Sequence, residues 1–302
     1  MNDLVRVAPH VAAALAAGDP VVALETTLVT HGLPRPEGLA TAADLERMVA
    51  SRGAVPATIG ILAGRLHVGL APDELGRLAE EPGVAKVNPG NLAAVLAAGA
   101  SGSTTVATSL LAAHRAGIRV LATGGIGGVH RGAELTGDVS ADLVALARHP
   151  VAVVCAGAKA VLDLPRTLEM LETLGVPVLG ADTEEFPSFY RRTSGLRVDR
   201  ACAGAAGVAA ALRAHFALCA TGVVVANPIP PAHEMPAEAC AAAVDRAVAE
   251  AAAAGVRGRD VTPFLLDRVR TLTGGASVAV NQALLRANAT LAADVAVALA
   301  RA

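Results

Sequence analysis

The chain has 302 residues, of which 53% are hydrophobic and 17% are charged, and its formal net charge at pH 7 is −2. These values exclude an intrinsically disordered protein, which has too little apolar surface to build a core. They also argue against binding of a nucleic acid polymer, because no Lys/Arg cluster or aromatic stacking platform is present.

The chain shows no targeting or membrane-spanning pattern. Its N-terminus lacks a basic segment followed by an apolar one, and Gly, Pro or charged residues interrupt the other apolar runs, so we predict no membrane span. The cysteines form no C-x-x-C pair and lie in apolar or Ala-rich surroundings, so we expect buried, reduced thiols and a cytoplasmic protein. These are Cys155, Cys202, Cys219 and Cys240.

Strand-like and helix-like segments alternate through most of the chain. We predict strands at 21–24, 58–62, 85–87, 120–122, 151–155, 176–180 and 223–226, with a hairpin turning on Gly64. We predict helices at 38–52, 73–80, 92–98, 105–116, 141–148, 165–174 and 203–219, and later at 237–253, 263–273 and 277–300. The predicted fold class is therefore α/β, a single large domain over residues 1–302 with a mainly parallel sheet flanked by helices on both faces and a helical C-terminal region.

Two early loops carry polar residues. Glu25 directly follows a predicted strand, at the sheet edge where α/β proteins place their chemistry; a proton-transfer group and a carboxylate satisfied by nearby amides are both possible. Residues 99–106 are rich in small and hydroxyl side chains and lead into a helix at Thr105. That arrangement suits a phosphate, although a simple N-cap explains it as well.

A glycine-rich segment at 123–130 follows another predicted strand and ends at His130. Its spacing differs from the dinucleotide fingerprint, so we interpret it as a flexible loop over a ligand and expect no organic cofactor. Farther along, Asp138 is a candidate ligand for Mg²⁺ or Mn²⁺. Ser140 or Asp142 can instead act as an N-cap for the helix that follows.

Lysine occurs only at Lys86 and Lys159, although Lys and Arg together number 25. A guanidinium is not a nucleophile, whereas a lysine amine that has lost its proton attacks carbonyl carbon. Lys159 ends the apolar run that begins at Val151, so we predict it at the same sheet edge as Glu25. Asn281, on an apolar helix, suits an imide-bearing base or else is a satisfied core residue.

The order of these segments resembles the pseudouridine-5′-phosphate glycosidase family, also called the indigoidine synthase A-like family. The resemblance spans nearly the whole chain, through ALETTLVTHGLPRPEGLATA, GASGSTTVATS, ATGGIGGVHRGAELTGDVSADL, CAGAKAVLDLPRTLEMLETLGVPV and DVTPFLLDRVRTLTGGASVAVNQALLRAN. It implies cleavage of the carbon–carbon glycosidic bond of pseudouridine 5′-phosphate to uracil and ribose 5-phosphate. It also implies a homotrimer and a divalent cation, usually Mn²⁺.

The resemblance further implies roles for individual residues. Lys159 is the nucleophile that forms a Schiff base with C1′ of the opened ribose, Glu25 is the proton donor and Asp138 is the metal ligand. The expected substrate contacts are Lys86, Thr105, Val106, His130, Ser140, Ala141, Asp142 and Asn281.

One departure and two alternatives remain. Residues 88–91, Asn-Pro-Gly-Asn, stand where the family more often has Ser or Thr with basic residues, which puts the expected phosphate contacts in question. A Schiff-base aldolase or lyase acting on another sugar phosphate would use Lys159 without needing Asn281. A sugar-phosphate- or nucleotide-binding protein without catalysis would use Glu25 and Lys159 only as an ion pair.

Overall fold

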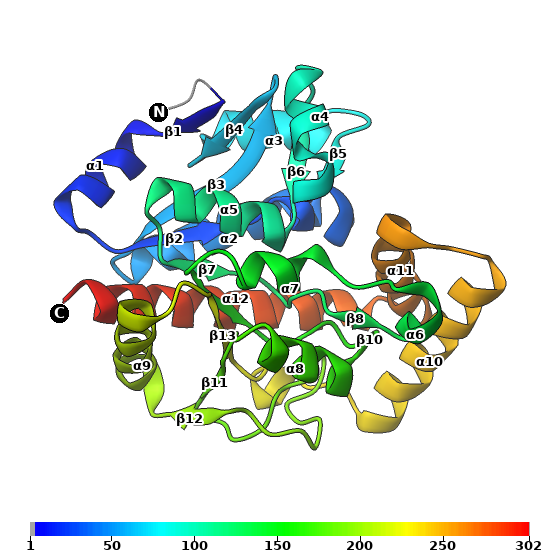
Figure 1. The fold of residues 1–302 in the computed structure, drawn as a ribbon. Coiled ribbons are helices and arrows are strands. Elements are labelled where there is room, and N and C mark those ends of the chain that lie inside the picture. Colours follow the sequence, from blue (N-terminus) through cyan, green and yellow to red (C-terminus); the bar gives the residue numbers. More distant parts are fainter. Residues whose placement is uncertain (1–3, 302) are drawn as a thin grey trace.

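The computed structural model describes residues 4–301, and a long sheet runs through it in the order β1-β4-β3-β2-β7-β9-β13-β11-β12 (Figure 1). Neighbouring strands from β3 through to β12 are parallel. Their bounds are β3 (Val55–Leu62), β2 (Val21–Leu24), β7 (Val120–Ala122), β9 (Ala152–Cys155), β13 (Val223–Ala226), β11 (Val178–Ala181) and β12 (Arg200–Cys202). The central ones are buried along their whole length, as expected for Val/Ala/Leu-rich strands covered on both faces.

The sheet becomes mixed beyond β3. A tight turn at Gly64 folds β3 back onto β4 (Arg65–Val68), which confirms the predicted hairpin. Gly64 has φ +72°, and a Cβ there would lie 2.6 Å from the Leu96 carbonyl oxygen, so the turn requires glycine. Three further strands, β1 (Val5–Val7), β5 (Ala85–Val87) and β6 (Gly102–Thr104), extend this part, and β8 (Val129–His130) pairs separately with β10 (Leu162–Asp163).

Helices surround the sheet. In chain order they are α1 (Pro9–Ala17), α2 (Glu37–Ser51), α3 (Pro72–Glu80), α4 (Pro89–Ala97), α5 (Val106–Ala116), α6 (Ala133–Thr136), α7 (Ala141–Leu146), α8 (Leu164–Thr173), α9 (Gly204–Leu218), α10 (Ala237–Ala253), α11 (Val261–Leu272) and α12 (Ala276–Ala300). Short turns are the π-helix η1 (Leu28–Gly32) and the 3₁₀ turns η2 (Pro231–His233) and η3 (Gly258–Asp260). Figure 1 shows α10 and α11 side by side at one end of the molecule, with α12 crossing its middle.

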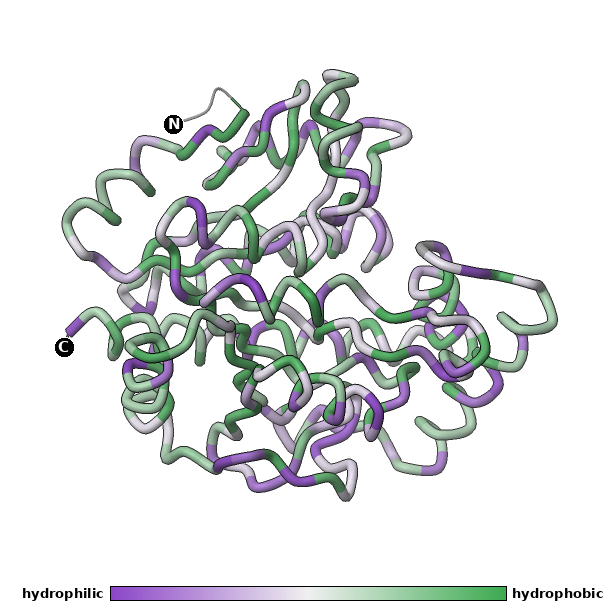
Figure 2. The backbone as a smooth tube through the Cα atoms, viewed as in Figure 1, coloured by the Kyte–Doolittle hydropathy of each residue, from purple (hydrophilic) through white to green (hydrophobic). Residues whose placement is uncertain are grey.

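The longest helix, α12, belongs to the core. By length and composition alone it could cross a membrane, but half of its most apolar window is buried inside the protein. It packs against α2, α9 and the strands β2, β7 and β9. Figure 2 shows the hydrophobic segments gathered along these central strands, while hydrophilic segments are more frequent in the outer loops.

The predicted α/β class with its helical C-terminal region is confirmed, and most predicted elements agree with the observed bounds to within about three residues. The sequence does not predict β1 or α1, because β1 is three residues long and α1 is Ala-rich with little amphipathic pattern. The cysteine prediction is wrong at one position. Cys155, Cys202 and Cys240 are buried, but Cys219 at the end of α9 is exposed.

Candidate active site

A cavity of about 230 Å³ lies at the carboxyl ends of β2, β7 and β9. One water needs roughly 10–15 Å³ by a comparable measure, so the cavity has room for a larger ligand. Every residue predicted for the site lines it, and these are Glu25, Lys86, Thr105, Val106, His130, Asp138, Ser140, Ala141, Asp142, Lys159 and Asn281.

We call Glu25, Thr123, Gly125 and Lys159 the floor of the cavity. Glu25 is the first residue after β2, Thr123 the first after β7, and Lys159 follows β9 by four residues. Thr123 Oγ1 donates a hydrogen bond to Glu25 Oε1, and Lys159 Nζ donates one to the Gly125 carbonyl oxygen at 2.8 Å. One short loop therefore holds both the carboxyl group and the amine.

Burial raises the pKa of the Glu25 carboxyl above its ordinary value. The Lys159 ammonium and the Thr123 hydrogen bond oppose this shift, the Asp142 charge adds to it, and Lys86 opposes it more weakly. A glutamate whose pKa is raised in this way holds its proton closer to neutral pH. Glu25 therefore meets the requirement for a proton donor.

Lys159 is half-buried and lines the same cavity as Glu25, so its amine does not extend into bulk solvent. The Gly125 carbonyl binds Nζ through one N–H. An amine that has lost its proton keeps its lone pair while donating such a bond. The contact therefore orients the nitrogen without blocking its attack on carbon.

We call Lys86, Thr105, Val106, His130, Asp138, Ser140 and Ala141 the wall. Thr105 is the N-cap of α5, and its hydroxyl accepts from the Thr108 amide at 3.5 Å. Asp142 Oδ1 accepts from the Ala107 amide at 2.9 Å. The protein thus occupies the second and third amides of α5, while the Val106 amide begins the helix at the cavity, where a phosphate would be favoured.

Asp142 joins separate parts of the site. Its side chain is 5% exposed, and its second oxygen, Oδ2, accepts from the Gly127 amide at 2.8 Å. Ser140 is the N-cap of α7 and accepts from the Asp142 amide at 3.2 Å, which confirms the capping alternative for Ser140. Since backbone amides take both carboxylate oxygens, Asp142 fixes the loop positions around a ligand.

Burial changes the pKa values of two titratable residues of the wall, Lys86 and His130. Desolvation lowers the pKa of Lys86, and the nearby Lys159 lowers it further. Burial also lowers the pKa of His130, against the opposing charge of Asp138. The His130 backbone amide donates to the Asp138 carbonyl oxygen at 3.0 Å, so these two residues are held together on the wall.

The glycine-rich loop differs from the flexible loop expected from its composition. Residues 123–128 are buried, and the Ile126 amide donates to the Gly157 carbonyl at 3.1 Å. A Cβ on Gly125 would lie 2.6 Å from Phe189, and one on Gly127 would lie 2.2 Å from Ser140 Oγ. These glycines allow close packing rather than motion.

The residues that follow Lys86 have a structural role. Asn88 is the N-cap of α4, its Oδ1 accepting from the Gly90 amide at 2.8 Å, while Asn91 Oδ1 accepts from the Asn88 amide at 2.9 Å. Asn91 Nδ2 also donates to the Lys86 carbonyl at 3.1 Å. Residues 88–91, which differ from the family pattern, thus form a capping box that supports Lys86. Asn88 itself lines the cavity.

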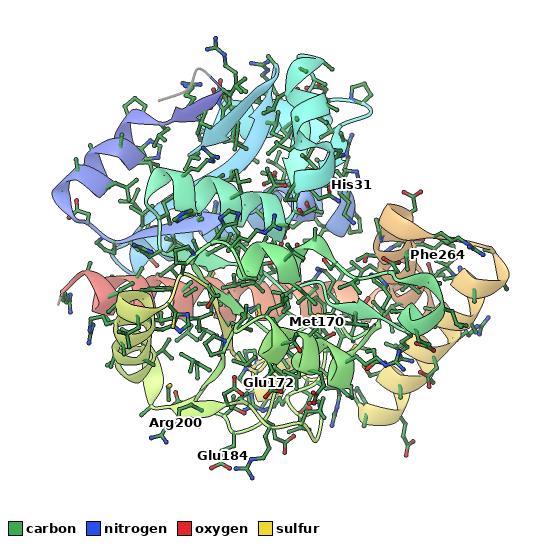
Figure 3. All side chains as sticks on the ribbon, viewed as in Figure 1. His31, Met170, Glu172, Glu184, Arg200 and Phe264 are labelled. Atoms are coloured by element: carbon green, nitrogen blue, oxygen red, sulfur yellow. The ribbon has the colours of Figure 1, made fainter. Side chains whose placement is uncertain are left out.

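Sequence reasoning missed several lining residues. His31 lies on the π-helical turn η1, and its Nδ1 contacts Thr30 Oγ1 at 2.6 Å and Ser103 Oγ at 3.2 Å. Figure 3 shows His31 on the side of the molecule where α11 carries Phe264. Phe189 and three residues of α11, Thr262, Pro263 and Leu266, also line the cavity. The sequences of these segments give no signal that they share a cavity.

Comparison with known proteins gives a consistent result. A family model described as indigoidine synthase A-like protein matches residues 10–298. Three relatives named pseudouridine-5′-phosphate glycosidase are 58% identical (Rhodospirillum centenum; 100% of this chain, 94% of the relative), 54% identical (Methylobacterium nodulans; 99% and 89%) and 51% identical (Geobacillus kaustophilus; 98% and 99%).

Two solved structures are also similar. The prealnumycin C-glycosynthase AlnA, in complex with ribulose 5-phosphate, has a TM-score of 0.92 at 36% identity, covering 100% of this chain and 98% of AlnA. An indigoidine synthase A-like protein from Thermotoga maritima has a TM-score of 0.89 at 35% identity, covering 99% and 97%.

Proposed function

We propose that this chain, which belongs to the indigoidine synthase A-like family, cleaves the carbon–carbon glycosidic bond of pseudouridine 5′-phosphate to give uracil and ribose 5-phosphate. The observation that carries the proposal is the floor. A lysine amine and a glutamate carboxyl with a raised pKa line one cavity and are held by the same loop.

Expulsion of a uracil carbon is difficult, and the floor supplies a covalent route around it. Glu25 gives a proton to the ribose ring oxygen as the bond from that oxygen to C1′ breaks, and the Lys159 nitrogen bonds to C1′. The new bond leaves an extra proton on that nitrogen, and the Glu25 carboxylate takes it, so that Glu25 is again a carboxylic acid. The bond from C1′ to uracil C5 then breaks as the nitrogen lone pair forms an iminium. The bond's electrons stay on C5, which takes a proton from Glu25.

Water completes the reaction. It adds to the iminium carbon, the bond from carbon to the Lys159 nitrogen breaks, and ribose 5-phosphate leaves as the aldehyde. One water is consumed overall, and both the amine and the carboxyl return to their starting states. Because each step is acid–base or addition chemistry, the route requires no organic cofactor.

The family resemblance also implies a divalent cation. In the described part of the chain, no group of three or more His, Cys, Asp or Glu side chains is placed to hold a metal. Asp138, half-buried on the wall, offers one carboxylate. That fits Mg²⁺ or Mn²⁺ bound through one carboxylate with water and substrate phosphate as the other ligands. We propose that Asp138 holds such an ion, Mn²⁺ above all, which when bound would neutralise phosphate charge.

Binding of a sugar phosphate has separate support, since the crystal structure of the similar protein AlnA is a complex with ribulose 5-phosphate. In this chain the Val106 amide and Lys86 supply the corresponding positive potential. A homotrimer and a cytoplasmic location stay predictions. Sedimentation of the purified protein would test the first and fractionation of cells the second.

The direct test is release of uracil from pseudouridine 5′-phosphate with Mn²⁺ present. Uridine 5′-phosphate serves as the control substrate, because it differs in the glycosidic linkage alone. We expect release of uracil from the C-nucleotide and, after borohydride reduction, a pentose-phosphate adduct on Lys159 by mass spectrometry.

The same assay separates the alternatives. An aldolase or lyase for another sugar phosphate would give an adduct with its own substrate but no uracil. A binding protein without catalysis would give neither uracil nor an adduct. Either result would overturn the proposed function.

A further inference from the structure

The geometry points to Asn288 as a positioning residue that sets the placement of both Glu25 and Lys159 through the loop between them. This inference rests on the proposed function. Asn288 lies on α12, is completely buried and is not among the residues that line the cavity. It therefore acts on the reaction through the floor, not by contact with a ligand.

The contacts of Asn288 use the whole side-chain amide. Its Nδ2 donates to the Thr123 carbonyl oxygen at 2.8 Å and approaches the Gly124 carbonyl oxygen at 3.3 Å. Its Oδ1 accepts from Asn227 Nδ2 at 3.0 Å. The Thr123 carbonyl requires a donor on one side and Asn227 requires an acceptor on the other, so only an amide satisfies both partners. The Gly124 carbonyl also accepts from the Ala156 amide at 2.9 Å.

The loop that Asn288 binds is the one that holds the floor. The Thr123 hydroxyl donates a hydrogen bond to Glu25, and the Gly125 carbonyl, two residues later, accepts a hydrogen bond from Lys159 Nζ. Asn288 binds the carbonyl groups of Thr123 and of Gly124 between them. A single displacement of residues 123–125 would thus move the supports of the proton donor and the nucleophile together.

Asn227 orders this arrangement from the opposite side. It directly follows β13, and its backbone amide donates to the Cys155 carbonyl at 2.8 Å, at the end of β9. Its side chain fixes which way the Asn288 amide faces. The hydrogen bonds of Asn288 and Asn227 therefore fix the loop relative to the ends of two core strands, β9 and β13. The loop also continues directly from a third strand, β7.

The test is steady-state kinetics on Asn288→Leu, which keeps the approximate size but removes the side-chain donor to the Thr123 carbonyl and the acceptor for Asn227 Nδ2. The Gly124 carbonyl keeps its bond from the Ala156 amide. We expect kcat for uracil release to fall about 100-fold, since misplacement of reacting groups by about 1 Å has effects of that size. KM should stay within about threefold, because the wall residues that bind substrate are not attached to Asn288.

The pH profile gives a second readout that a loss of stability alone would not produce. Glu25 faces Lys159, Lys86 and Asp142 as well as the Thr123 hydroxyl. A displaced loop would weaken the two largest interactions that lower the pKa of Glu25. The alkaline limb of kcat, which reports the proton donor, should therefore move to higher pH in Asn288→Leu.

Two further variants keep the test decisive. Val295→Ala is the matched control, because Val295 is fully buried two turns farther along α12 and lies outside the cavity; it should keep wild-type kcat and pH profile. Asn227→Ala should lower kcat about tenfold, and Asn227→Ala with Asn288→Leu should be no worse than Asn288→Leu alone, as for residues that act in series. If Asn288→Leu does not fold, the same two measurements are made on Asn227→Ala: kcat, and the position of the alkaline limb of the kcat profile.

The outcomes separate this inference from the proposed function. Suppose that wild type releases uracil and that folded Asn288→Leu has the same kcat and the same alkaline limb as wild type. The positioning role of Asn288 is then wrong and the proposed function stands. If wild type releases no uracil, the rate of borohydride trapping of ribose 5-phosphate on Lys159 replaces kcat. Equal trapping rates in wild type and Asn288→Leu would then overturn the inference, and a rate about 100-fold lower in the variant would support it.

Discussion

The floor and the wall of the cavity are built in different ways. Floor residues lie at or near the ends of buried parallel strands and are tied to one buried loop. Wall residues come from β5, the start of α5, β8, and the start of α7 with the turn before it. Asp142 of α7 accepts from the Ala107 amide of α5 and the Gly127 amide of the glycine-rich loop. Under the proposed function, the sheet fixes the groups proposed to react, while loops and helix termini supply the groups proposed to bind substrate. Floor substitutions should therefore act mainly on kcat and wall substitutions mainly on KM.

Lys159→Arg should give the largest effect and is the strongest test of the floor. The variant keeps a positive charge beside Glu25 but has no nucleophilic amine, so we expect turnover to fall about 10⁴-fold or more. Uracil release measures this loss, and circular dichroism checks the fold. Activity above about a tenth of wild type would show that the floor works without a covalent bond to Lys159.

Lys86→Met tests whether the wall acts on binding. Loss of one charged hydrogen bond costs about 1.5–3 kcal/mol, so KM should rise about 10- to 100-fold with kcat nearly unchanged. The matched control is Arg197→Met, which removes an exposed charge from the surface pair with Glu184 and should leave both constants as in wild type. A fall in kcat with unchanged KM would place Lys86 among the reacting groups instead and break the comparison.

Thr123→Val isolates one contact within the floor. The hydroxyl bond lowers the pKa of Glu25, so its removal should raise that pKa further. With Glu25 as proton donor, the alkaline limb of the kcat profile should move to higher pH, while kcat at the optimum falls by about tenfold at most.

Thr27→Val is the control for that experiment. Thr27 also lines the cavity, but its hydroxyl donates to the Thr104 carbonyl at 2.7 Å and not to Glu25. Its pH limb should stay in place. A limb that moves equally in both variants would mean that the profile does not report the bond between Thr123 and Glu25.

The floor was largely predictable from sequence because its signals are local. An apolar strand followed at once by Glu25, and an apolar run that ends at Lys159, place both residues at one edge of a parallel sheet. The supports of the floor were not predictable. Asn288 is 165 residues from Thr123, and the side-chain pattern of α12 does not show which carbonyl groups its amide will meet.

Several other residues that line the cavity escaped prediction for a similar reason. Leu266 and Pro263 belong to α11, whose sequence indicates a helix but not the surface on which it packs. His31 lies on a π-helical turn, a conformation that residue periodicity does not reveal. Local patterns thus determine strands and their polar ends, whereas contacts between distant segments determine which residues hold those ends and line the cavity beside them.

The smallest expected effect concerns a position remote from both floor and wall. Cys219 is exposed, whereas Cys155, Cys202 and Cys240 are buried, and burial raises the pKa of Cys155 to about 12. A thiol reagent at pH 8 should therefore modify one thiol in the folded protein and all four after unfolding in urea, with unchanged uracil release in the singly modified protein. Cys219→Ser should remove the reactive thiol and keep activity. It therefore serves as a neutral control with which the activities of the floor and wall variants are compared. Modification of Cys155 before unfolding, located by mass spectrometry, would show that the strands beneath the floor open, because Cys155 ends β9 and is completely buried.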